Sequence, residues 1–291
     1  MFIRVQGRKI KSMGYKVVVD SCGELTEEMK ASGRFETASL SIMIDEHTII
    51  DDDTFDQTDF LKKVAESPNC PKSACPSPEA YMEMYRGDEE HVYAVTLSSE
   101  LSGSYNSAVL GKNLYLEEYG QKDIYIFNSR SASVAESLIA MKIVEYEAEG
   151  LSFQQIVDKV ETYIEQQKTY FVLESLETLR KNGRLTGLKA LVATALNIKP
   201  VMGATAQGTI FQRGQARGIK KALTKMVDEI VKELKNPEEK ILGISHCNCR
   251  SRAEEVKKLL EEKIKVKKIF IIDTRGISSL YANDGGIIVA V

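Results

Sequence analysis

The sequence predicts an α/β protein of two domains, in which a Rossmann-like αβα domain with a mainly parallel sheet precedes a smaller α/β domain with a mixed sheet. The chain has 291 residues, enough for two domains. In its first half, short β-branched runs alternate with amphipathic stretches, as in βαβ units. Near Tyr170 the pattern changes to a hairpin and further strands. We predict an N-terminal extension at 1–14, a first domain at 15–166 and a second at 167–291.

Three short apolar runs predict the sheet of the first domain, because strands of a parallel sheet are buried on both faces. These runs are residues 15–19, 92–97 and 124–127. Apolar residues repeat with a helical period at 104–119, 131–149 and 152–167. A helix around 59–67 and short strands at 37–44 and 48–50 complete the predicted domain.

The second domain is predicted to mix strands and helices. Its strands are expected at 170–174, 199–202, 209–213, 241–246, 268–273 and 286–291. Helices are expected at 176–182, 188–196 and 251–263, and an amphipathic helix begins at Ile219 and ends near Leu234. No long linker separates the two halves, so we expect a ligand site in the cleft between the domains.

Composition favours a cytoplasmic protein that binds neither nucleic acid nor the membrane interior. The formal net charge is −3, and no apolar run approaches the roughly 20 residues of a membrane span. Five cysteines without the spacing of a disulfide framework predict free thiols. Cys247 and Cys249 follow His246, but the other ligands that zinc requires are not nearby, so we predict no metal site.

Serines gather where the predicted strands of the first domain end. The three segments are 20–23 (DSCG), 98–104 (SSELSGS) and 128–131 (NSRS). The carboxyl ends of parallel strands meet at one edge of the sheet, where ligands of open α/β sheets bind. Each serine alone is better explained as a helix N-cap, worth about 1 kcal/mol. Three clusters at one edge favour a site for an anionic oxygen.

The sequence lacks the partners that a catalytic serine requires. A serine nucleophile needs a base, and of the three histidines we expect His47 and His91 at the surface. Neither a G-x-S-x-G elbow nor a phosphate-binding G-x-x-x-x-G-K-[ST] loop is present. We therefore predict a binding protein without enzymatic activity. A phosphate- or nucleotide-binding enzyme of small molecules is the alternative, and a serine hydrolase is a weaker one.

A proline-rich segment follows the helix at 59–67. Pro71, Pro76 and Pro78 predict a rigid extended loop instead of a helix, and this loop holds Ser73.

Several segments, taken in order, resemble the motifs of the DegV family, and the resemblance extends from about Tyr15 to Val291. The most specific match is 97–108 (LSSELSGSYNSA), which is similar to L-S-S-x-L-S-G-T-Y-x-S-A. The others are 20–25 (DSCGEL, similar to D-S-x-x-D/E-L), 73–77 (SACPS, at the place of T-S-Q-P-S), 176–184 (LETLRKNGR, similar to L-x-x-L-x-K-G-G-R), 196–200 (LNIKP) and 217–222 (RGIKKA).

This resemblance implies a fold and a function. DegV proteins are two α/β domains that bury a fatty acid, and some are the acyl-binding subunit of bacterial fatty acid kinase. Such a subunit presents the carboxylate for ATP-dependent phosphorylation. The resemblance therefore implies a long-chain fatty acid as ligand, no cofactor, and a kinase subunit as a possible partner.

The resemblance also implies the site residues. By position, Ser73 and Ser102 hold the carboxylate, and Ser104 replaces a family threonine beside them. Arg184 and Arg217 correspond to basic residues near the head group or the partner. Tyr281 stands where a histidine is usual in the family; a phenol can donate a hydrogen bond but cannot carry positive charge near neutral pH.

Overall fold

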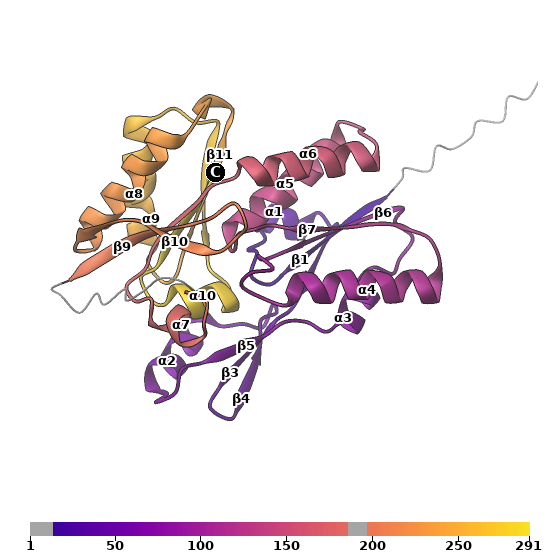
Figure 1. Ribbon diagram of the computed structural model, residues 1–291, viewed down its shortest axis with the longest axis horizontal. Coiled ribbons are helices and arrows are strands. Elements are labelled where there is room, and N and C mark those ends of the chain that lie inside the picture. The colour runs from indigo at the N-terminus through magenta and orange to yellow at the C-terminus, as the bar shows by residue number, and fades with distance from the viewer. Residues whose placement is uncertain (1–13, 186–196) are drawn as a thin grey trace, which may run out of the picture.

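The computed structural model describes residues 14–185 and 197–291, and these form a two-domain α/β fold (Figure 1). The predicted fold class is confirmed: a parallel four-stranded sheet and a mixed six-stranded sheet are present. The predicted helix at 188–196 and the extension before Gly14 lie outside the described residues. The predicted boundary at 166/167 falls between a helix and a strand, and it stays a prediction. In the described ranges, no helix is long and apolar enough to cross a membrane.

The first sheet has strand order β2-β1-β6-β7 and is parallel throughout. Its strands are β1 (Tyr15–Asp20), β2 (Phe35–Ala38), β6 (His91–Thr96) and β7 (Asp123–Asn128). One face packs against α3 (Pro78–Met84) and α4 (Ser104–Tyr119), and the other against α5 (Val134–Ala148) and α6 (Phe153–Gln166). Apolar strands covered on both faces produce the predicted three-layer arrangement. A short helix, α1 (Glu27–Ala31), follows β1.

A small antiparallel sheet projects below the first (Figure 1), with strand order β4-β3-β5. Its strands are β3 (Ser41–Ile44), β4 (His47–Ile50) and β5 (Lys72–Ala74), and α2 (Gln57–Glu66) precedes β5. The strand predicted at 37–44 was wrong, because this segment is divided between two sheets. The extended loop predicted at 71–78 was partly wrong. Lys72–Ala74 pairs with β3, and Pro78 opens α3 after the N-cap Ser77, a position where proline fits a helix.

The mixed sheet has strand order β10-β9-β8-β13-β11-β12, in which only β11 and β12 are parallel neighbours. The strands are β8 (Thr169–Val172), β9 (Ile198–Ala204), β10 (Ile210–Arg217), β11 (Ile241–His246), β12 (Lys268–Asp273) and β13 (Ile287–Ala290). Helices α8 (Ile219–Glu233) and α9 (Arg250–Lys263) cover one face with their apolar sides. A 3₁₀ turn, Pro237–Glu239, leads into β11.

Helix α5 lies between the two larger sheets (Figure 1). Ile139 and Ile143 pack on the first sheet, whereas Val134 and Leu138 pack beside Ala290 of β13. All residues from Val134 to Ala140 are buried, so the first half of this helix lies in the protein interior. It joins the two halves of the chain into one packed body.

Two short helices, α7 (Glu177–Lys181) and α10 (Gly276–Ala282), lie at the junction of the mixed sheet and the small sheet (Figure 1). The sequence patterns did not predict α10. Its residues Ile277 and Leu280 pack with Ile42 of β3 and Phe60 of α2, so the C-terminal segment contributes to the core of the N-terminal part.

Candidate functional site

A cavity lies between the loops that follow the strands of the parallel sheet and the face of the mixed sheet opposite α8 and α9. Its volume is about 90 Å³. Arg184 is the one charged side chain among the described residues that line it. The first half of the chain contributes Cys22, Leu97, Leu101, Ser131, Ala132 and Ser133 to the lining. The predicted cleft between the two halves is therefore present, and it is apolar.

The cavity runs along β8. Thr169, Phe171 and Leu173 line it, whereas Tyr170 and Val172 point into the core beneath α8. Alternation of side chains along a strand explains this division. At about 3.3 Å per residue, Thr169 and Leu173 are about 13 Å apart. Arg184 lies near the Leu173 end of the cavity, and Ser131 lies at the Thr169 end.

Arg184 marks the end near Leu173, because it follows β8 through the short helix α7. Gly183, at φ +74°, ends that helix in the left-handed conformation, which turns the chain back. The Arg184 Nε then donates to the Leu101 carbonyl at 3.1 Å, and Nη1 donates to the carbonyl of Asn182. Within the described parts of the chain, Nη2 has no partner.

Tyr281 and Ser73 lie at the same end. Tyr281 is on α10, which precedes β13, and β13 runs antiparallel to β8, so α10 lies beyond the carboxyl end of β8. The Tyr281 ring centre is 5.8 Å from the Arg184 guanidinium carbon. The Ser73 and Tyr281 hydroxyl oxygens are 2.9 Å apart. All three side chains are partly exposed, so this end is the mouth of the cavity.

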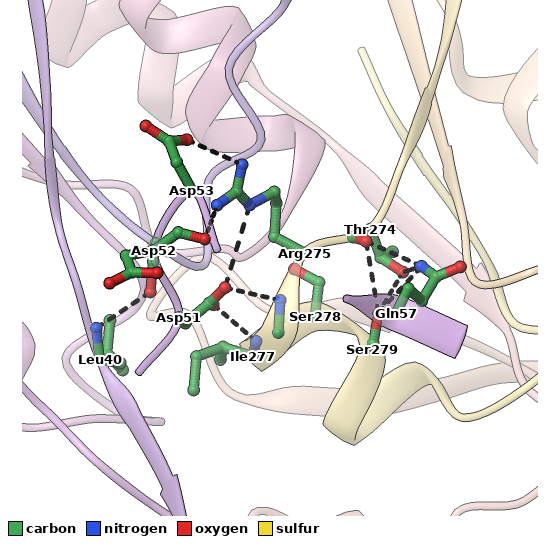
Figure 2. Close-up of polar contacts among 12 residues, drawn as sticks. Leu40, Asp51, Asp52, Asp53, Gln57, Thr274, Arg275, Ile277, Ser278 and Ser279 are labelled. Atoms are coloured by element: carbon green, nitrogen blue, oxygen red, sulfur yellow. Dashed lines mark hydrogen bonds and ion pairs between the residues drawn. The ribbon is translucent and has the colours of Figure 1, made fainter. Parts of the chain in front are cut away.

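Helix α10 is held from a distant segment by Asp51, which is fully buried (Figure 2). The Asp51 carboxylate accepts the backbone N–H groups of Gly276 and Ile277, each at 2.8 Å. Burial raises the pKa of Asp51, although these two hydrogen bonds lower it. Arg275 lies beside the same loop and pairs with Asp53 at 3.3 Å. A carboxylate at the start of a helix satisfies unpaired N–H groups and interacts favourably with the helix dipole.

Gln57, at the start of α2, holds the same region (Figure 2). Its side-chain amide donates to the Thr274 carbonyl at 2.8 Å and to Ser279 Oγ at 3.1 Å. The position of the cavity mouth therefore depends on hydrogen bonds between segments more than 200 residues apart in sequence.

The predicted site residues do not all meet at the mouth. Ser73, Tyr281 and Arg184 do. Ser102 does not line the cavity, and its hydroxyl accepts the Ser104 N–H at 3.2 Å. Ser104 instead points inward, where its hydroxyl donates to Asp20 at 2.7 Å. Arg217 is exposed at the end of β10 and does not line the cavity.

Most strand-end serines form internal hydrogen bonds. Ser98 donates to the Gly208 carbonyl at 2.9 Å, and Ser129 donates to the Ser131 carbonyl at 3.2 Å. Ser21 accepts the Leu40 N–H at 3.0 Å. These hydroxyls position loops, and the proposed anion-binding role for the clusters as a whole does not fit their geometry.

Buried acidic side chains lie just outside the cavity wall. Burial raises the pKa of Asp20 to about 6 and of Glu24 to about 8. Glu136, on α5, has a pKa raised well above its usual range by burial and then by the nearby Asp20. Neither Glu136 carboxyl oxygen has a hydrogen-bond partner among the described residues, so no donor stabilises its charged form.

The same cluster contains side chains that could hold a metal ion. Potential ligand atoms of Asp20, Cys22 and Glu136 all lie within 4.8 Å of one another. The Asp20 oxygens already accept from the N–H groups of Cys22 and Leu97, and burial raises the pKa of the Cys22 thiol. Burial that keeps these side chains protonated therefore accounts for the cluster without an ion.

None of the three histidines lines the cavity. His47 is exposed on β4, as predicted. The surface position predicted for His91 was wrong: its ring is buried and lies 2.9 Å from the Glu147 carboxylate, because the end of α5 covers the start of β6. His246 is also buried. The described cavity thus lacks a histidine base.

The fold and cavity define a class: an α/β binding protein with an apolar ligand cavity between two domains. Comparison with known proteins agrees. The family model described as uncharacterised proteins of the DegV family matches residues 15–291, and the chain belongs to the DegV family.

Three similar proteins illustrate the relationship. A DegV-family protein of Ruminococcus gnavus, solved with vaccenic acid, is 61% identical with a TM-score of 0.94, over 96% of this chain and 100% of that one. The Fatty Acid Kinase (Fak) B3 protein of Streptococcus pneumoniae, loaded with linoleic acid, is 31% identical with a TM-score of 0.85, over 96% and 99%. A DegV domain-containing protein of Streptococcus gordonii is 34% identical, over 95% of this chain and 98% of its own length.

Proposed function

We propose that this protein binds a long-chain fatty acid, with its hydrocarbon in the cavity along β8 and its carboxylate at the mouth. The observation that carries this proposal is the charge distribution of the cavity. Its wall is apolar, and Arg184, the one charged lining residue in the described part of the chain, lies at the partly exposed end beside Tyr281. An anion with a long apolar tail matches both features. The fatty acids named for similar structures support the same ligand class.

The mouth offers a set of hydrogen-bond donors to a carboxylate. Arg184 Nη2 can donate to it. The hydrogen bond between Ser73 and Tyr281 uses one of their two hydroxyl protons, so one of these hydroxyl groups can donate to the carboxylate as well. Hydrogen bonds to a charged group contribute about 1.5–3 kcal/mol each. The tail contributes more, since each buried methylene is worth roughly 0.8 kcal/mol and a palmitoyl chain has about 14 of them. Affinity should therefore follow chain length, and the polar groups should set orientation.

The volume of about 90 Å³ is smaller than that of typical small-molecule sites, which occupy about 300–1,000 Å³. Accommodation of a long chain thus requires the lining side chains to move apart. Binding that requires such a change is slower than simple encounter. We expect slow uptake and slow release of the fatty acid.

We further propose that the protein performs no chemistry itself and presents the carboxylate to a fatty acid kinase. The partly exposed head-group residues and the absence of a histidine in the cavity lining support this role, as does similarity to the Fak B3 protein. The test is to combine the loaded protein with a fatty acid kinase catalytic subunit, ATP and magnesium. Acyl phosphate should form in the mixture and not with either protein alone.

The ligand proposal has its own experiment. Organic extraction of the purified protein followed by mass spectrometry should recover long-chain fatty acids. Calorimetry on delipidated protein should show affinity increasing from octanoate to palmitate. Equal affinity for acetate and palmitate would contradict the proposal.

A further inference from the structure

Two hydroxyl groups lie at the inner end of the cavity. Ser131 Oγ and Thr169 Oγ1 lie 2.6 Å apart, and both residues line the cavity. Their exposed fractions are only 5% and 7%, so both side chains are largely buried. An apolar wall thus finishes in two hydroxyl groups, about 13 Å from Leu173 along β8.

One hydroxyl proton of this pair lacks an acceptor. Each hydroxyl carries one proton and two lone pairs. The hydrogen bond between Ser131 and Thr169 uses one proton, and within residues 14–185 and 197–291 neither side chain donates elsewhere. A buried donor without an acceptor is unfavourable. The pair can therefore donate one hydrogen bond to a group that enters the cavity, and its remaining lone pairs can accept one.

A second, polar cavity of about 300 Å³ lies directly behind the pair. It shares Ser131 and Thr169 with the first cavity and is also lined by Arg130, Glu165 and Lys168. A purely hydrocarbon chain end would meet polar surface at this point. A chain end that carries an oxygen would find hydrogen-bonding partners.

An acyl chain is long enough to reach the pair. With C–C bonds of about 1.5 Å at near-tetrahedral angles, a saturated chain with as many carbons as vaccenic acid spans roughly 20 Å when extended. This length exceeds the path of about 13 Å from Leu173 to Thr169. The far end of such a chain therefore lies at or beyond the hydroxyl pair.

On the basis of the proposed fatty-acid binding, we infer that Ser131 and Thr169 form a distal subsite for an oxygen at the far end of the chain, as in an ω-hydroxy fatty acid. A terminal hydroxyl both accepts and donates, which matches the free proton and lone pairs of the pair. A terminal carboxylate fits less well, since a buried charge needs more partners than two hydroxyls provide.

The test compares ω-hydroxyhexadecanoic acid with hexadecanoic acid by calorimetry on the delipidated full-length protein. The wild type should bind the hydroxy acid at least as tightly as the plain acid. Thr169→Val keeps the shape of the side chain and removes the hydroxyl. It should weaken binding of the hydroxy acid about tenfold and change that of the plain acid less than about threefold. Ser131→Ala should act in the same direction.

Thr162→Val, at an exposed position on α6, is the matched control and should leave both affinities unchanged. The inference is overturned if the wild type binds the hydroxy acid tenfold more weakly than the plain acid, or if Thr169→Val changes both affinities equally. Binding of the plain acid by a folded variant shows that the cavity is intact. If the wild type binds neither ligand, the proposed function itself fails; if it binds only the plain acid, this inference alone fails.

Discussion

Ser73 and Tyr281, 208 positions apart in sequence, place their hydroxyl oxygens 2.9 Å from each other at the mouth of the cavity. Ser73 comes from the small antiparallel sheet and Tyr281 from a helix at the end of the chain. Their contact joins the N-terminal and C-terminal parts of the chain at the cavity mouth, where the Arg184 guanidinium lies beside the Tyr281 ring. Side chains from three separate segments thus meet at the mouth of the cavity.

Arg184→Gln should weaken palmitate binding about 10- to 100-fold, because a hydrogen bond from a charged donor to a carboxylate is lost. Binding of the fatty alcohol of equal length should change little, since it lacks the charge. Calorimetry with both ligands separates these effects. Arg217→Gln is the matched control: this arginine is exposed and does not line the cavity, so palmitate affinity should stay the same. An equal loss of palmitate affinity in both variants would show that the carboxylate does not bind at Arg184.

Tyr281→Phe should weaken palmitate binding about fivefold, the value of one hydrogen bond of about 1 kcal/mol. The ring remains to pack against the cavity, so stability should change little. Tyr281→His should retain binding and make it stronger at acidic pH, where imidazolium carries charge. Affinities of both variants measured over a pH series would check this. A pH-independent affinity for the histidine variant would argue that this position does not face the carboxylate.

Asp51→Asn should lower the free energy of unfolding by about 1–3 kcal/mol, because the buried carboxylate accepts two N–H groups at the start of α10 and an amide can replace only one. Urea denaturation measures the change. Asp53→Asn is the control, since the Asp53 side chain is 92% exposed and its pair with Arg275 should contribute less than about 1 kcal/mol. Equal effects of the two substitutions would contradict a specific role for Asp51.

The buried acids predict that stability falls as pH rises. The pKa of Glu24 is raised from 4.5 to about 8, so the folded protein holds a proton that the unfolded chain releases above about pH 4.5. This contribution is complete below the unfolded pKa and is lost as pH increases toward 8. Asp20, with a pKa raised to about 6, acts in the same direction.

Glu136→Gln tests the same cluster. The amide cannot ionise, so the variant should be more stable than the wild type by more than about 1 kcal/mol near pH 8, with a flatter pH profile. Urea denaturation at several pH values gives the two profiles. Glu165→Gln, on the exposed face of α6, should follow the wild type. Parallel profiles for Glu136→Gln and the wild type would show that Glu136 is ionised in the folded state.

Gly208→Ala should destabilise the protein by more than about 2 kcal/mol. Gly208 has φ +94°, and an added Cβ would collide with Ser98 Oγ and lie 2.9 Å from the Arg130 Cα. Gly120 has a similar φ of +88° and open space around it, so Gly120→Ala isolates the backbone cost of a positive φ, about 1–3 kcal/mol. Thermal unfolding gives the loss of stability in each variant, and the difference between the two losses is the cost of the steric clash at Gly208. Similar losses would mean that the β9–β10 turn moves away at little cost.

Local patterns predicted much of the secondary structure. The helix Ser104–Tyr119 and the strands Ile241–His246 and Lys268–Asp273 have the predicted bounds, because buried strands and amphipathic helices leave their period in the residues that form them. The resemblance to family motifs predicted Ser73 and Arg184 as site residues, and both lie at the cavity mouth.

Other features had no local signal. Helix α10 has no side-chain cap of its own, since Asp51 supplies its acceptor from 225 residues away. Likewise, the hydroxyl of Ser104 turns toward Asp20 because β1 lies beside β6, a neighbour set by strand order.

The sequence by itself determined the α/β class, the family and the position of most strands and helices, because these depend on composition and on periods of a few residues. Only the tertiary structure decided that Thr169, Phe171 and Leu173 face a cavity, that Arg184 is its one charged lining residue among those described, and that Ser131 meets Thr169 at its inner end. Such contacts join residues far apart in the chain, and they exist only once the sheets and α5 have packed together.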